Sequence, residues 1–144
     1  MKTIFAGVVI TTIFLTTIAT GCKPTDSNSV TIEVKGGEFD ANANITKTIE
    51  VIYPGLVIVK LDSNPSTGFS WAATAVNSDT NLISQSENKY VAPDVTGVVG
   101  AAGKTVWTFR TLKKGTATLN FEYSQPWAGE QKSVRTVQLI ITVK

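Results

Sequence analysis

The stretches TATLNFEYS (residues 116–124) and VRTVQLIITV (residues 134–143) decide the fold class of the chain. In the first stretch every second residue is apolar or aromatic, namely Ala117, Leu119, Phe121 and Tyr123. In the second stretch the same register runs from Arg135 to Val143, and Ile140 is the one apolar residue on the polar side. A repeat of two residues is typical of half-buried antiparallel strands.

Six further β-rich runs precede these two, and turn residues such as Tyr53-Pro54-Gly55 separate the runs. We expect strands over residues 30–34, 46–52, 56–62, 69–76, 82–90 and 105–112. No window has the apolar spacing of a capped amphipathic helix. Seven or eight strands in about 115 residues predict one all-β domain over residues 30–144, an immunoglobulin-like antiparallel β-sandwich.

The first 21 residues have the pattern of a signal peptide. Lys2 supplies a positive start, residues 4–18 form an uncharged and largely apolar run, and Ala19-Thr20-Gly21 supplies small residues for cleavage. The apolar run is shorter than the roughly 20 residues of a membrane span. We therefore expect residues 1–21 to be removed on export.

Cys22 is the only cysteine, so the chain can form no internal disulfide. A lone cysteine directly after a small-residue cleavage site resembles a bacterial lipobox, although Ala19 stands where that motif usually has Leu. The resemblance implies lipidation of Cys22, a polar tether over residues 22–29, and anchoring on a bacterial cell membrane at its periplasmic or outer face. The alternative is an ordinary secretory signal followed by a free cysteine.

Composition excludes several classes of function. The chain has 13 basic and 11 acidic side chains and no histidine. Without a basic stripe, nucleic acid is not an expected partner. Without histidine there is no Ser-His-Asp triad, no Cys-His pair and no imidazole ligand, so we expect neither an enzyme nor a metal or cofactor site.

The first unusual loop is DSNPSTGFSW, residues 62–71. Asn64-Pro65 favours a turn, and Gly68 tolerates a positive φ, so local sterics restrict the backbone. We expect a stiff and exposed wedge with the small residues Ser66 and Thr67 at its tip. The alternative is a purely structural hairpin, and Trp71 belongs to the core in either case.

The second unusual loop is PDVTGVVGAAG, residues 93–103, which has no charge after Asp94. Solvated loops normally carry polar residues, so its valines and alanines favour a contact surface. It lacks the strand-turn-helix context of a dinucleotide loop and the Lys-Ser/Thr pair of a phosphate loop. The alternatives are a flexible connection and a dimer contact.

The third unusual loop is SQPWAGEQK, residues 124–132. Pro126 stiffens a turn that would expose Trp127, and tryptophan is a frequent hot-spot residue in protein interfaces. The alternative is that Trp127 folds back onto its own sheet. In an immunoglobulin-like sandwich the first and third loops lie at the same end, and the second loop can join them there.

With these three loops the chain resembles the chagasin family of cysteine protease inhibitors. NPSTGFSW (residues 64–71) resembles the family's first-loop motif NPTTGY/F-x-W. Gly97-Val98-Val99-Gly100 followed by Ala101 resembles its Gly-x-x-Gly loop, and Gln125-Pro126-Trp127 resembles its Arg-Pro-Trp loop. The three motifs occur in the family's order across essentially the whole domain.

The resemblance implies reversible inhibition of papain-like cysteine proteases by steric occlusion of the active-site cleft. It assigns protease binding to Asn64, Pro65, Ser66, Thr67, Gly68, Phe69, Gly97, Val98, Val99, Gly100, Ala101, Gln125, Pro126 and Trp127. It places the tip around Thr67 over the catalytic cysteine, Trp127 on the primed side of the cleft and the Gly-rich loop on the unprimed side. Gln125 stands where the family usually has Arg, so a charge-assisted contact is lost.

Two other functions remain open on the residues alone. One is a membrane-anchored surface binding module that uses Trp127, Tyr123 or Phe69 to bind carbohydrate or a protein receptor. It predicts aromatic residues along a sheet face, whereas an inhibitor predicts them at one end. The other is a carboxylate-based hydrolase, which needs two facing acids, for example from Asp62, Asp94 and Glu130.

Overall fold

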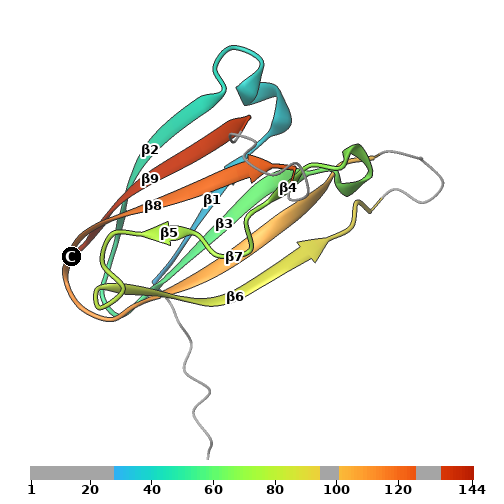
Figure 1. Ribbon diagram of the computed structural model, residues 1–144. Coiled ribbons are helices and arrows are strands. Elements are labelled where there is room, and N and C mark those ends of the chain that lie inside the picture. The colour runs from blue at the N-terminus through green and yellow to red at the C-terminus, as the bar shows by residue number, and fades with distance from the viewer. Residues whose placement is uncertain (1–27, 95–100, 126–133) are drawn as a thin grey trace, which may run out of the picture.

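The computed structural model describes residues 28–94, 101–125 and 134–144 (Figure 1). These residues form the strands and short 3₁₀ helices β1 (Ser29–Val34), η1 (Gly36–Phe39), β2 (Asn44–Val51), β3 (Leu56–Ser63), η2 (Pro65–Thr67), β4 (Ser70–Trp71), β5 (Val76–Asn77), β6 (Ile83–Val91), β7 (Gly103–Thr111), β8 (Gly115–Ser124) and β9 (Arg135–Val143). Within the described ranges, no helix has the length and apolar character to cross a membrane.

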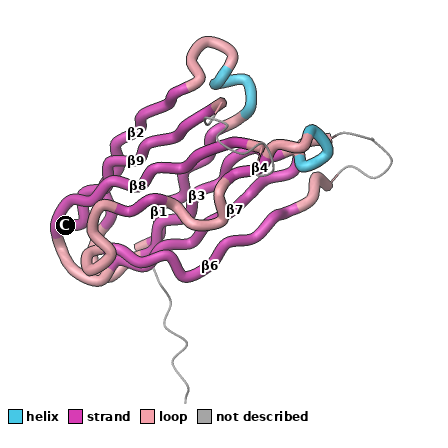
Figure 2. Tube along the Cα trace, viewed as in Figure 1, coloured by secondary structure: helices cyan, strands magenta, loops and turns pink. Residues whose placement is uncertain are grey.

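The strands build two sheets that face each other as a sandwich (Figures 1 and 2). One sheet has the order β1-β3-β7-β6, and the other has the order β2-β9-β8-β4, with β5 added beside β8. The predicted all-β sandwich is therefore confirmed. The strands expected at residues 116–124 and 134–143 are β8 and β9, and they pair antiparallel.

One predicted strand is wrong. Residues 69–76 form the two short strands β4 and β5, with residues 72–75 leaving the sheet between them. The side chain of Gln85 explains the interruption, since its Nε2 donates to the carbonyl of Ala73 at 2.8 Å and its Oε1 accepts from the backbone N–H of Ala75 at 3.2 Å. These backbone groups bond across to β6 and are not used for pairing with β8.

Most neighbouring strands pair antiparallel, as expected, but each sheet also contains one parallel pair. β1 pairs parallel to β3, and β2 pairs parallel to β9. After β1 the chain crosses through η1 to the opposite sheet, so β1 and β2 never pair as a hairpin and instead occupy the outer edges of different sheets. Residue alternation cannot reveal this, because side chains alternate in the same way in parallel and antiparallel strands.

The core lies between the two sheets and combines aliphatic side chains with a group of packed aromatic rings. Trp107 and Phe109 of β7 are fully buried, and each meets Phe121 of β8 edge to face, at centroid distances of 4.9 Å and 6.0 Å. Leu119 and Leu139 fill the space beside them. The residues that the alternation of β8 and β9 assigned to one face are therefore the ones that face the core.

A buried hydroxyl fixes the turn between β2 and β3. Thr111, at the end of β7, accepts a hydrogen bond at 2.8 Å from the backbone N–H of Gly55 and donates to the carbonyl of Gly55 at 3.1 Å. The backbone N–H of Thr111 also donates to that carbonyl. A Cβ on residue 55 would lie 2.5 Å from the carbonyl oxygens of Asn28 and Ile52, so this close approach requires glycine.

Thr111→Val is expected to lower the free energy of unfolding by about 1–3 kcal/mol, because the buried N–H of Gly55 loses its acceptor while the side-chain shape is kept. Urea unfolding of the two proteins measures the difference. Thr108→Val is the matched control, since that half-exposed hydroxyl on the same strand has only a 3.5 Å contact to Glu87. Equal effects of the two substitutions would contradict the assigned role of Thr111.

Candidate functional site

The loop after β3 is a compact, self-supporting wedge. The side-chain oxygen of Asn64 accepts from the backbone N–H of Ser66 at 3.2 Å and from its hydroxyl at 2.6 Å. The carbonyl of Asn64 accepts from the backbone N–H and the hydroxyl of Thr67, at 3.1 Å and 2.7 Å. Pro65 opens the 3₁₀ turn, and Gly68 ends it in the left-handed region at φ 81°. Pro65, Ser66 and Thr67 are exposed at the tip, as the sequence predicted.

Trp71 closes this loop at its base. Its indole Nε1 donates to the carbonyl of Asp62 at 2.9 Å, so the two ends of the loop are joined. The ring is buried and packs on Phe39, Trp107 and Tyr123 at centroid distances of 5.9, 6.4 and 4.9 Å. Trp71 therefore connects the base of the first loop to the core of the sandwich.

Phe69 and Gln125 belong to the bases of their loops. Phe69 is half-buried and stacks on Tyr123 at 5.7 Å, with the two rings 23° from parallel. Gln125 is also half-buried, directly after β8. Phe69 and Gln125 lie next to the paired residues Ser70 and Ser124, so this pairing of β4 with β8 places the bases of the first and third loops side by side.

The second loop begins and ends beside the first. Ser63, the last residue of β3, pairs with Gly103, and Val91 at the end of β6 pairs with Lys104. A side chain at position 103 would collide with the hydroxyl of Tyr90 and the carbonyl of Val91, so only glycine fits. Ala101 is half-buried at this base. The predicted contact residues Gly97, Val98, Val99 and Gly100 lie outside the described residues.

The third loop starts and ends on the paired strands β8 and β9. Tyr123 pairs with Arg135, and the backbone N–H of Val134 donates to the carbonyl of Tyr123 at 2.9 Å. Val134 itself is 42% exposed. Pro126 and Trp127, which were predicted to contact a protease, lie outside the described residues.

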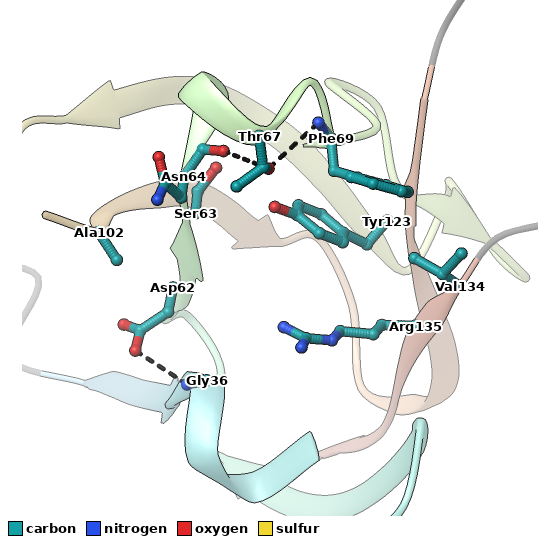
Figure 3. Close-up of a pocket in the computed structure, with 10 residues that line it drawn as sticks. All are labelled: Gly36, Asp62, Ser63, Asn64, Thr67, Phe69, Ala102, Tyr123, Val134 and Arg135. Atoms are coloured by element: carbon teal, nitrogen blue, oxygen red, sulfur yellow. Dashed lines mark hydrogen bonds between the residues drawn. The ribbon is translucent and has the colours of Figure 1, made fainter. Parts of the chain in front are cut away.

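The bases of all three loops meet around one open hollow of about 360 Å³ (Figure 3). The first loop contributes Asn64, Thr67 and Phe69, the second contributes Ala102, and the third contributes Tyr123 and Val134. The loops therefore share one end of the sandwich, as expected for an immunoglobulin-like strand order.

Two charged groups, Arg135 and Asp62, line the hollow at this end. The guanidinium of Arg135 points into the hollow, 5.1 Å from the ring centre of Phe39 and 5.9 Å from that of Tyr123 (Figure 3). Across the hollow, Asp62 accepts from the backbone N–H of Gly36 at 2.9 Å. The position of Arg135 on the apolar face of β9 was the only sequence signal for its role, since a cation in that register needs aromatic or acidic neighbours.

Lys104 of β7 forms ionic contacts across the sheet β1-β3-β7-β6, beside the second loop. Its ammonium donates a hydrogen bond to the carboxylate of Glu33, and it lies 3.8 Å from Asp62. This hydrogen bond lowers the pKa of Glu33 and raises the pKa of Lys104. Both groups remain ionised at neutral pH, so the pair links β1 to β7 across β3.

The described residues at this end do not bring together the groups that a metal site or a two-carboxylate hydrolase needs. No group of His, Cys, Asp and Glu side chains within residues 28–94, 101–125 and 134–144 could hold a metal ion. Of the acids proposed for a hydrolase, Asp62 and Asp94 line different hollows, and Glu130 lies outside the described residues.

Comparison with known proteins identifies the same family as the loop motifs. Residues 55–141, more than half of the chain, match the model of the chagasin family peptidase inhibitor I42. Chagasin of Trypanosoma cruzi is 34% identical over 85 residues, which cover 57% of this chain and 76% of that protein. Amoebiasin-2 of Entamoeba histolytica is 29% identical over 97 residues, which cover 67% of this chain and 77% of that protein.

Solved structures show the same fold. The cysteine protease inhibitor EhICP2 of Entamoeba histolytica superposes with a TM-score of 0.63 at 23% identity, covering 81% of this chain and 97% of that one. PbICP-C, solved in complex with falcipain-2, gives a TM-score of 0.58 at 15% identity, covering 81% of this chain and 99% of that one. The chain therefore belongs to the chagasin family of peptidase inhibitors, which confirms that it is an inhibitor and not an enzyme.

Proposed function

We propose that this chain inhibits papain-type cysteine proteases reversibly by inserting its three-loop end into the active-site cleft. The observation that carries the proposal is the meeting of three loop bases around one hollow, beside a first loop that its own hydrogen bonds hold in shape. A cleft binder needs such a projection, because little conformational entropy is then lost on docking.

The tip of the first loop suits a narrow cleft and resists cleavage. Ser66 and Thr67 are small and exposed, and Pro65 has no backbone N–H to be desolvated. The backbone of residues 64–68 is turned, with hydrogen bonds from Thr67 to Asn64 and from Gly68 to Pro65. A 3₁₀ turn differs from an extended peptide, so it offers no aligned scissile bond to the catalytic cysteine of the protease.

The other two loops supply the apolar contacts in this proposal. Val98, Val99 and Ala101 line the unprimed side of the cleft, and Trp127 packs on the primed side, where burial of a large aromatic ring contributes strongly to affinity. Gln125 offers a neutral hydrogen-bonding group in place of a cation. A neutral hydrogen bond contributes about 0.5–1.5 kcal/mol, against about 1.5–3 kcal/mol for a charged one, so Gln125 weakens binding or changes the preferred protease.

The competing binding-module function has less support. Tyr123, one of its three aromatic residues, is buried under Phe69 and Trp71 and offers no platform for a sugar ring. Among the residues that the structure describes, the exposed aromatic side chains are Tyr53 and Tyr90, which lie at opposite ends of the sandwich and form no row along a sheet face.

We further propose that the chain is a bacterial lipoprotein, exported by residues 1–21 and anchored to a membrane through Cys22. The support is the lipobox-like sequence around the single cysteine and the short polar tether that follows it. The target protease therefore meets the inhibitor at a membrane surface.

Trp127→Ala is expected to weaken inhibition of papain by about 30-fold, since hot-spot aromatic residues contribute about 2 kcal/mol or more. Titration of papain activity with the full chain in detergent measures the inhibition constant. Tyr53→Ala, which removes an exposed aromatic ring at the other end of the sandwich, is expected to leave the constant unchanged. Absence of papain inhibition by the unmodified chain at micromolar concentration would refute the proposed target class.

Asn64→Ala is expected to weaken papain inhibition by about tenfold, because the freed loop must be ordered on binding. The melting temperature should change little, since the contacts of Asn64 with Ser66 lie at the exposed tip. Asn42→Ala is the matched control, because Asn42 makes the same kind of turn by accepting from the backbone N–H of Asn44 at 2.9 Å. Equal inhibition constants for the two variants would show that the shape of the first loop does not matter.

Cys22→Ser is expected to move the chain from the membrane fraction to the soluble fraction of a bacterial host, because the thiol that carries the lipid is lost. Flotation of membranes on a density gradient, followed by mass spectrometry of the amino-terminal peptide, measures the change. Ser29→Ala should float with the membranes as the unmodified chain does. Flotation of the Cys22→Ser variant would contradict the anchor.

A further inference from the structure

Three apolar side chains are exposed at the end of the sandwich opposite the inhibitory loops. Ile52 is 62% exposed, Tyr53 is 41% exposed and Leu112 is 44% exposed. Ile52 and Tyr53 follow the end of β2, and Leu112 follows the end of β7. We call these three residues the basal patch.

The turns that carry the basal patch are fixed against each other by main-chain hydrogen bonds. The N–H of Tyr53 donates to the carbonyl of Lys144 at 2.8 Å, and the N–H of Lys144 donates to the carbonyl of Val51 at 2.9 Å. Thr111, directly before Leu112, is bonded to Gly55 through both its backbone and its hydroxyl. The patch is thus held on a rigid surface, although none of its side chains contributes to the buried core.

The described chain begins at this same end. The carbonyl of Asn28 accepts from the N–H of Leu56 at 3.0 Å, and the side-chain amide of Asn28 donates to the carbonyl of Pro54 at 3.2 Å. Cys22 lies six residues before Asn28, and six residues reach at most about 20 Å even when fully extended. An anchor on Cys22 therefore keeps the basal patch, and not the inhibitory loops, next to the membrane.

We propose that the basal patch lies on the lipid bilayer that carries the anchor and so orients the inhibitor. The inference rests on the proposed lipidation of Cys22. Aliphatic and tyrosine side chains are suited to the boundary between headgroups and acyl chains. Because the anchor already holds the domain at a high local concentration near the bilayer, these few contacts need only select its orientation.

The charges around the basal patch indicate that its contact with the bilayer depends more on apolar side chains than on electrostatic attraction. Lys113 lies 3.5 Å from Asp79, and Lys144 lies 2.7 Å from Glu50, so carboxylates offset both cations. Among the described residues at this end, Arg110 and Lys114 are the cations for which the structure gives no ion pair. Two cations, at about 1 kcal/mol each, are few beside the roughly 4–8 of a typical polybasic lipid-binding segment, so the contact should persist at high salt.

This orientation has a direct consequence for inhibition. β8 runs from the basal end to the inhibitory end with ten residues, which corresponds to about 33 Å. The three loops would therefore be held about 30 Å above the bilayer and face the surrounding solution. A protease could then bind without displacing the domain from the membrane.

A fluorescent probe at the patch tests the inference. The full lipidated chain carrying Ile52→Cys is labelled with a polarity-sensitive dye. Because the lipid occupies the thiol of Cys22, the dye reacts with the introduced thiol. The labelled protein is then placed on vesicles of phosphatidylethanolamine and phosphatidylglycerol. Quenching by lipids spin-labelled in their acyl chains is expected to be about threefold stronger than for Ala41→Cys, an exposed site at the other end. Equal quenching at the two sites would overturn the inference, as would loss of the difference in high salt.

A second comparison separates the patch from general effects of charge. Adding Leu112→Asp to the labelled chain is expected to reduce the quenching by about half, because a carboxylate is costly at the interface. Adding Val76→Asp should leave the quenching unchanged, since Val76 of β5 is 60% exposed and pairs with Asn120, halfway along β8. Papain inhibition in detergent confirms that each variant is folded. Equal effects of the two substitutions would refute the role of Leu112.

The same samples distinguish failure of the anchor from failure of the orientation. If the chain does not float with the vesicles, both the lipid anchor and the inference fail. If it floats but the labels at positions 52 and 41 are quenched equally, the anchor stands and the orientation is refuted. Neither result affects the inhibition of papain by the loops.

Discussion

The contacts of the Trp71 indole are the constraint on which the rest of the structure depends. The ring lies in the core against Tyr123 of its own sheet and Trp107 of the opposite sheet. Its N–H donates to the carbonyl of Asp62, where the first loop leaves β3. One side chain thus joins the two sheets and the base of the inhibitory wedge, so the position of the loop is set by packing of the core.

The two ends of the sandwich are stabilised differently, and this difference follows their proposed roles. At the basal end, main-chain bonds among the turns and the buried hydroxyl of Thr111 hold the surface close to the sheets. At the inhibitory end, the first loop projects into solvent and keeps its shape through contacts of Asn64 that are local in sequence. A local network lets the tip vary in sequence without disturbing the core, which is useful for a protein that must fit a particular cleft.

Charge at the inhibitory end comes from within the fold. Arg135 is half-buried over the rings of Phe39 and Tyr123, and Lys104 is shared by Glu33 and Asp62. These cations organise the bases of the loops, whereas the third-loop motif carries the neutral Gln125. In our proposal, occlusion of the protease therefore relies on shape and apolar contact more than on ion pairs.

The sequence by itself determined the local features. Alternation predicted β8 and β9 with their buried faces, and the turn chemistry around Asn64-Pro65 and Gly68 predicted the wedge, because both depend on neighbours in the chain. It could not show that β1 and β2 pair parallel with β3 and β9, since side chains alternate equally in both kinds of pairing. It also could not show that Gln85 interrupts the strand expected at 69–76, or that Arg135 lies over Phe39. Only the tertiary structure decided these points, because each depends on contacts between residues that are distant in the sequence.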